Sequence, residues 1–185
     1  MRGIRHTVLC ALFLLAVLLS SCGDSDAPLP PQTYSMGDRV VLGNIVYVVY
    51  ETQWLTHLGE GVDARVPRNR FFLVRLSAVN SSNREITVPN FKVEDDNGTV
   101  YPELGGDQAG GVPQYIGYLR RVAPANSVQG HALFDAPPRH YKLRLMDEDG
   151  EKTAFVDIPL SFTSESPDVP QVGKKETDPS TPLRK

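Results

Sequence analysis

Cysteine is nearly absent from this sequence, and its absence limits the chemistry open to the folded part. The 185 residues contain two cysteines, Cys10 and Cys22, and both lie near the N-terminus. From residue 23 onward the sequence offers neither a pair of thiols for a disulfide nor a thiolate for a metal site. The folded part must therefore depend on its apolar core, and thiol catalysis is excluded there.

The chain also lacks an excess of basic residues. It has 19 Lys and Arg against 22 Asp and Glu, which gives a formal net charge of −3 at pH 7. Removal of residues 1–21, predicted below, takes away only Arg2 and Arg5 and leaves 17 basic against 22 acidic residues, a net charge of −5. Nucleic-acid binding depends on a basic patch, so we predict no nucleic-acid partner.

Known catalytic and cofactor motifs are missing as well. The sequence has no Gly-x-Ser-x-Gly elbow and no Gly-x-x-x-x-Gly-Lys phosphate loop. His57, His131 and His140 each lack a second histidine at the spacing of a zinc site. The acidic stretches 94–98 and 147–150 lack an EF-hand loop, and we interpret them as turns rather than calcium sites. We predict no enzyme activity, catalytic residue, metal or cofactor.

No apolar run is long enough to span a membrane as a helix. The longest, Val8–Leu19, has roughly a dozen residues, whereas a span needs about 20. Arg2 and Arg5 precede this run and two serines follow it. A basic start, a short apolar run and small residues together indicate an export signal, so we assign residues 1–21 to a signal peptide.

The end of this segment, Leu19-Ser20-Ser21-Cys22, resembles the lipobox of bacterial lipoproteins. The resemblance implies that Cys22 is acylated, becomes the mature N-terminus and holds the protein on the extracytoplasmic face of a cell membrane. Two or three acyl chains such as palmitate anchor a protein without a spanning segment. Gly23 favours the outer membrane if the host has two membranes. The alternative is an ordinary secretory signal with a coincidental cysteine.

The segments on either side of the central region are poor in apolar residues. Residues 22–36 combine the predicted lipid-bearing cysteine with prolines, small residues and acidic residues, which is typical of a flexible tether. Residues 163–185 are rich in proline and charge and cannot bury a core, so we expect a disordered tail. A partner-binding role is the alternative for this tail.

Between tether and tail, over residues 37–162, apolar and polar residues alternate with a period of two. β-branched and aromatic residues dominate these stretches, as they do in strands. Gly43-Asn44 and Asp147–Gly150 are turn sequences, and Pro89 predicts a strand edge or bulge because it cannot donate to a ladder. The pattern predicts an all-β fold, a single antiparallel sandwich of seven to eight strands. The expected strands include 40–42, 45–50, 71–78, 86–93, 132–134, 141–145 and 156–160.

Four motifs follow one another in this region. They are Gly37-Asp38, Phe72-x-Val74-x-Leu76-x-Ala78-Val79-Asn80, Phe91-x-Val93-x-Asp95-x-Asn97-Gly98 and Gly130-x-Ala132-Leu133-Phe134-Asp135. Their order resembles the immunoglobulin-like, antigen-type β-sandwich family of secreted bacterial lipoproteins, which is a domain of unknown function. The resemblance implies an immunoglobulin-like β-sandwich outside the cytoplasm, with no established catalytic residues.

Aromatic residues and one glycine-rich loop are the candidates for binding. The loop from Leu104 to Tyr118 contains two Gly-Gly pairs, and Tyr115 and Tyr118 lie at its end. As anchors, these tyrosines and Trp54 suit a peptide or protein partner. For Trp54 we favour a structural place in the sandwich core or at its rim, whereas the tyrosines could equally pack along an edge. We predict a non-catalytic interaction module for another envelope protein or peptide, with strand addition as one mode. A receptor for a small ligand or ion is the alternative.

Overall fold

The computed structural model describes residues 30–161 of the chain. The predicted signal peptide, Cys22, residues 23–29 of the predicted tether and the predicted tail (163–185) lie outside the described residues, so these assignments stay predictions. Residues Thr33–Ser35, at the end of the predicted flexible tether, form a strand instead. Within residues 30–161, no helix has the length and apolar character needed to cross a bilayer.

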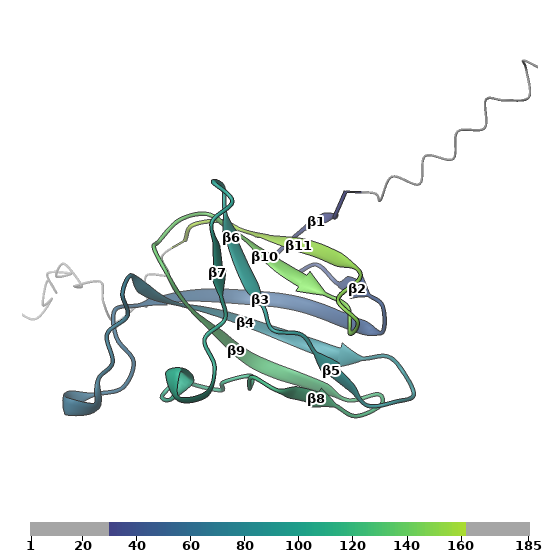
Figure 1. Cartoon of the computed structure of the whole chain (residues 1–185), viewed down its shortest axis with the longest axis horizontal. Helices are drawn as coiled ribbons and strands as arrows, with labels where there is room; N and C mark the ends of the chain where they lie inside the picture. Colours follow the sequence, from purple (N-terminus) through teal and green to yellow (C-terminus); the bar gives the residue numbers. More distant parts are fainter. Residues whose placement is uncertain (1–29, 162–185) are drawn as a thin grey trace, which may run out of the picture. The chain divides into compact units, whose positions relative to one another are not determined.

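One sheet contains five strands and joins distant parts of the chain (Figure 1). Its only parallel pair is β1 with β11, and its other neighbours are antiparallel. In spatial order the strands are β1 (Thr33–Ser35), β11 (Thr153–Ile158), β10 (Tyr141–Met146), β6 (Lys92–Asp95) and β7 (Val100–Pro102).

The second sheet has four antiparallel strands and contains the two longest. A register shift between Val49 and Glu51 marks a bulge in β3. A separate ribbon pairs β5 (Ile86–Val88) with β8 (Arg120–Val122). In spatial order the strands of the second sheet are β2 (Val40–Leu42), β3 (Ile45–Leu55), β4 (Arg70–Asn80) and β9 (Ser127–Ala136).

The main core consists of the alternating apolar side chains of both sheets and of the ribbon. Trp54 is 4 % exposed, and its ring stacks on Phe72 with 4.2 Å between centroids. Tyr141 is fully buried, and its hydroxyl donates to the carbonyl of Pro137 at 2.6 Å. A buried aromatic hydroxyl needs such a partner, so the Tyr141 ring can lie in the core with its polar tip satisfied.

The predicted β-sandwich is confirmed, and so are its main turns. Gly43-Asn44 joins β2 to β3, and the predicted turn 147–150 lies within the connection 147–152 from β10 to β11. The expected strand 86–93 is wrong as one element: β5 ends at Val88, immediately before Pro89, and β6 begins at Lys92 in a different sheet. The structure has more strands than expected, because the segments β1, β7 and β8 of three residues each are too short to show alternation. The last strand lies earlier in the chain than predicted, since β11 spans Thr153–Ile158 instead of 156–160 and leaves Leu160 exposed.

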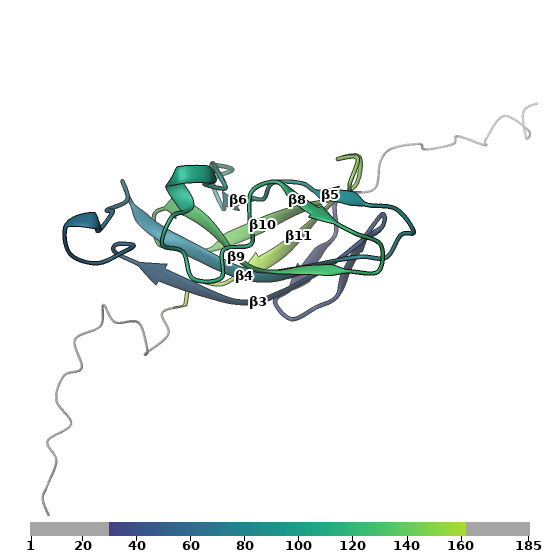
Figure 2. The same ribbon diagram turned by 90° about the horizontal axis from the view of Figure 1, so that it is seen from below.

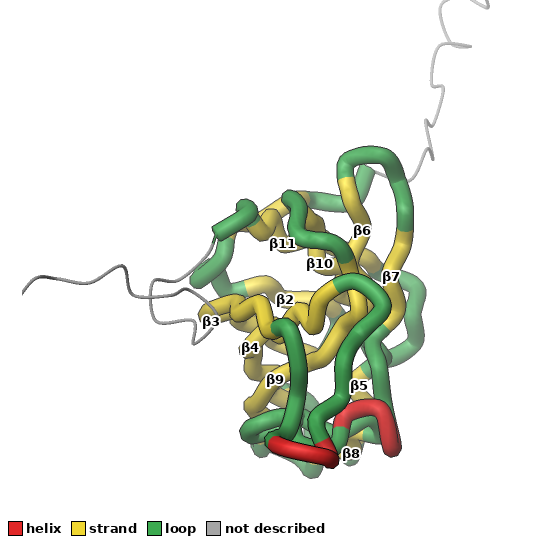
Figure 3. Tube along the Cα trace, turned by 90° about the vertical axis from the view of Figure 1, so that its left-hand side faces the viewer, coloured by secondary structure: helices red, strands yellow, loops and turns green. Residues whose placement is uncertain are grey.

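A second apolar cluster lies on the outer face of the four-stranded sheet. Two loops supply the residues that cover it, and each contains a short 3-10 helix: η1 (Gly61–Asp63) and η2 (Gly106–Ala109). Figures 2 and 3 show both helices at the same end of the sandwich, where β3 ends and β4 begins. The buried members of the cluster are Leu58, Phe71, Leu73, Ala109, Val112 and Leu133.

Candidate functional site

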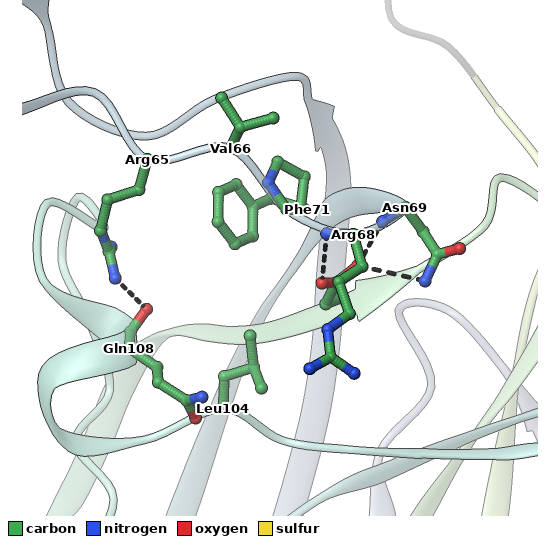
Figure 4. A pocket seen from close by; sticks show the side chains of 9 residues that line it. Arg65, Val66, Arg68, Asn69, Phe71, Leu104 and Gln108 are labelled. Carbon is green, nitrogen blue, oxygen red and sulfur yellow. Dashed lines mark hydrogen bonds between the residues drawn. The ribbon is translucent and has the colours of Figure 1, made fainter.

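A surface groove of about 670 Å³ lies between the two loops. The loop that contains η1 spans residues 57–69, and we call it the 57–69 loop. In the loop that contains η2, we call residues 105–113 the strap. Phe71 and Leu104 supply apolar surface to the groove, and arginine side chains lie on its rim (Figure 4). The complete lining is Arg65, Val66, Pro67, Arg68, Asn69, Phe71, Leu104, Gln108 and Asp135.

Asp135, near the end of β9, fixes one wall of the groove. Its carboxylate accepts the backbone N–H groups of Arg68 at 2.7 Å and Asn69 at 2.8 Å. It also accepts the Asn69 side-chain amide at 3.3 Å. These bonds hold the end of the 57–69 loop against β9, so the Asp135 carboxylate serves the backbone in this conformation.

Arg65 joins the 57–69 loop to the strap. Its guanidinium donates to the carbonyls of Asp107 at 3.0 Å, Gln108 at 2.6 Å and Gly110. These are acceptors at the end of η2, where helix carbonyls have no intrahelical partner. Arg65 therefore closes one side of the groove with charge-assisted hydrogen bonds.

The residues on either side of the strap are attached to the backbone of β9. Leu104 N–H donates to Leu133 O at 2.8 Å, and on the other side His131 N–H donates to Gln114 O at 2.9 Å. Gly130 allows this close approach, since a Cβ there would overlap the carbonyl oxygen of Gln114. Gly130 lies within β9 and thus admits the neighbouring segment against the strand.

Next to the strap lies a fully buried ion pair between Arg120 and Glu103, both with side chains 0 % exposed. Arg120 also donates to the carbonyls of Gly117 at 2.5 Å and Pro89 at 3.1 Å. Its guanidinium lies 4.4 Å from the centroid of the Phe91 ring. Burial raises the pKa of Glu103, and the charge of Arg120 opposes that rise. The pair links the ends of β5, β7 and β8 beneath the segment that carries the strap.

The three predicted aromatic anchors occupy different environments. Trp54 lies in the core, which agrees with the structural alternative for this residue. Tyr115 is half-buried, and its hydroxyl donates to Leu104 O at 3.3 Å. Tyr118 is 41 % exposed and its ring packs against Gly105. None of the three lines the groove, although both tyrosines lie near the ends of the strap.

The acidic stretches and histidines have partners within the fold. Asp95 accepts the N–H groups of Asn97 and Thr99 in the β6–β7 turn, and these bonds, the one from Thr99 foremost, lower its pKa. The ring nitrogens of His140 contact Asp96 at 2.7 Å and Asp157 at 2.8 Å. Among residues 30–161, no three His, Cys, Asp or Glu side chains gather closely enough to hold a metal ion.

Sequence reasoning missed Arg65, Arg68, Glu103 and Arg120. Isolated charged residues in a polar loop usually face solvent, so the pattern gave no sign that Arg120 and Glu103 are buried. One usable signal was the presence of Arg65, Arg68 and Arg70 within six residues of an otherwise acidic chain. Such a cluster indicates a locally basic surface, and two of its members line the groove.

Comparison with known proteins identifies the domain. A family described as Domain of unknown function (DUF4352) matches residues 34–153. The chain belongs to this family. The expected membership of a β-sandwich family of unknown function is thereby confirmed, while the lipobox lies outside the matched residues. No curated protein matches the chain.

Solved structures share the fold of this DUF4352 domain at low identity. The yjhA protein from Bacillus subtilis has 13% identity and a TM-score of 0.52, covering 68% of this chain and 98% of its own. The secreted protein MPT63 from Mycobacterium tuberculosis has 17% identity and a TM-score of 0.50, covering 71% and 98%. At this level of identity the similarity concerns the sandwich alone.

Proposed function

We propose that the protein is a membrane-anchored extracytoplasmic lipoprotein whose DUF4352 sandwich acts as a non-catalytic protein-interaction module of the cell envelope. The docking site is the groove between the 57–69 loop and the strap. The observation that carries this proposal is the groove itself, about 670 Å³ of surface volume that combines apolar side chains with arginines. Apolar surface with a few placed polar groups is the composition of binding sites.

The groove suits an extended peptide that carries an acidic side chain. Phe71 and Leu104 offer apolar contacts, and Val66, 79 % exposed, extends the apolar surface at the rim. The guanidinium of Arg68 has no hydrogen-bond or ion-pair partner among residues 30–161 and is free to meet a carboxylate (Figure 4). Arginine pairs with carboxylates through two parallel hydrogen bonds, which would fix the direction of the peptide.

The membrane anchor rests on the lipobox resemblance at Cys22. We expect Cys22→Ser to abolish the incorporation of labelled palmitate and to release the protein from the membrane fraction. Cys10→Ser is the matched control, because it removes the other thiol of the chain from within the signal and should change neither result. Membrane retention of unlabelled Cys22→Ser, or a wild type that takes up no label, would refute the anchor.

The docking site is tested by retention of an envelope protein on the immobilised protein. Val66→Asp places a charge on the apolar rim of the groove and should abolish retention. Val41→Asp is the control, because Val41 on β2 is also exposed, at 56 %, and does not line the groove. Equal loss in both variants, or retention that survives Val66→Asp, would argue against the groove.

A small-ligand receptor is the second candidate. It is favoured by the volume of the groove, which falls in the range of about 300–1,000 Å³ typical of small-molecule sites. The Asp135 carboxylate is already engaged by backbone donors, so an organic ligand fits better than a metal ion. Native mass spectrometry of the protein purified from its host would show a bound small molecule if this candidate is correct.

A further inference from the structure

The strap covers an apolar surface that would otherwise face solvent. Ala109 and Val112 are its buried residues, and they pack with Phe71, Leu73 and Leu133 in the second cluster. The strap thus contributes small side chains, whereas the sheet beneath it contributes large ones. A segment attached mainly through small apolar side chains buries little area, and its local stability is correspondingly low.

Grooves lie on both sides of the strap. The first, of about 670 Å³, includes Leu104 and Gln108, and a second of about 510 Å³ includes Gly111 and Pro113. The second groove is also lined by Leu58, a member of the same apolar cluster. The strap therefore separates two surface grooves that border one apolar surface.

Arg65 holds the strap in this position. All three of its acceptors are backbone carbonyls of strap residues, at Asp107, Gln108 and Gly110. The strap also contains glycines with positive φ, +57° at Gly106 and +81° at Gly111. Such residues allow the backbone to change direction at little steric cost. The backbone attachments of Leu104 and Gln114 to β9 flank the strap, and at its end the carbonyl of Pro113 contacts His131 Nδ1 at 2.7 Å. The part of the strap before Pro113 can therefore lift while the ends stay fixed.

We propose that the strap is a displaceable cover, latched by Arg65, and that the docking peptide takes its place on the second cluster. This rests on the proposed function, and it specifies the partner further. The peptide carries two apolar side chains three residues apart, as Ala109 and Val112 are in the strap. It also carries a carboxylate, because Arg65 loses its three carbonyl acceptors when the strap lifts. A carboxylate can take their place through two parallel charge-assisted hydrogen bonds.

Hydrogen exchange of the full chain tests the latch without any partner. Arg65→Gln should raise the exchange rates of amides in residues 105–113 by about tenfold or more, while the amides of β4 and β9 keep their rates. The same variant should increase the fluorescence of the apolar dye ANS. Arg68→Gln is the matched control, because it removes an arginine from the same loop that makes no side-chain bond to the strap. Arg65→Lys, which keeps the charge without the planar fork of donors, should give an intermediate rate.

Hydrogen exchange and partner retention separate a failed latch from a failed docking site. Unchanged exchange in residues 105–113 would overturn the latch, and so would an equal rise across the whole sandwich, which would mean general destabilisation. Retention of the envelope partner by wild-type protein tests the proposed function separately, so a failed latch and a failed docking site give different results. If both hold, Arg65→Gln should change partner retention at least severalfold, whereas retention identical to wild type would refute displacement of the strap.

Discussion

The buried pair of Arg120 and Glu103 gives the sharpest prediction about the fold. Both side chains are fully buried, and the Arg120 guanidinium also donates to the carbonyls of Gly117 and Pro89. Glu103 in turn accepts the N–H of Phe91 at 2.9 Å. Arg120→Met keeps much of the apolar stem but leaves the carboxylate and two carbonyls without their donor.

The expected cost follows from the burial of the pair. Removing one partner of a buried ion pair costs about 3–5 kcal/mol, because a charge is left in the interior without compensation. For a domain of this size, one kcal/mol corresponds to roughly 3–4 °C in Tm, so we expect a fall of about 9–20 °C. That is a large share of the total stability of an ordinary domain, about 5–15 kcal/mol.

Urea unfolding of the purified protein measures this cost. Arg75→Met is the matched control, since Arg75 pairs with Glu51 at 3.1 Å on the surface and its side chain is 34 % exposed. Surface pairs contribute about 0–1 kcal/mol, so the control should lose far less. If Arg120→Met destabilises the protein no more than Arg75→Met does, the buried pair does not hold the fold together in the way described.

The pH dependence provides an independent check. Burial already raises the pKa of Glu103, and without Arg120 nothing of comparable strength opposes the rise. An acid with a raised pKa in the folded state binds protons more readily when folded, so stability increases as pH falls through that pKa. Arg120→Met should therefore recover part of its loss between pH 7 and pH 5, and a deficit independent of pH would contradict this account.

Three further predictions concern the turns and the segment beside β9. Hydrogen bonds to Asp96 and Asp157 raise the pKa of His140. The ion pairs of protonated His140 should contribute about 0.2–1 kcal/mol to the free energy of unfolding. This contribution should be present at pH 5.5 and vanish as pH rises through the raised pKa. The stabilities of wild type and His140→Gln should therefore converge at pH 9. Gly130→Ala should cost about 1–3 kcal/mol in urea unfolding, because its methyl group overlaps backbone. Millimolar calcium or chelator should leave Tm unchanged, because Asp95 is occupied by backbone donors.

The layers of the fold could be predicted from sequence because alternation and turn chemistry are local properties. Strands such as β10 and β11 alternate over six residues and are joined by a recognisable turn. β1 could not be found, because it has three residues and pairs in parallel with the last strand of the chain. Its place depends on a contact across more than a hundred positions, which no local pattern reports.

The candidate site could be predicted only in part. The glycine pairs between Leu104 and Tyr118 indicated a loop that could carry binding, and this segment does border the groove. The other half of the site, the 57–69 loop, carried no motif. Its position depends on Asp135 and its contact with the strap depends on Arg65. Both are ordinary surface residues in the sequence, and only the tertiary fold gives them partners.

Photo-crosslinking in living cells is the most direct test of the central claim that the groove is a docking site on a membrane-anchored module. A photoreactive phenylalanine analogue at position 66 should give one defined adduct in the membrane fraction, and Arg68→Glu in the same protein should reduce that adduct by charge repulsion. The analogue at position 41 on β2 should give no such adduct. No adduct from position 66, or the same adduct from both positions, would contradict the account.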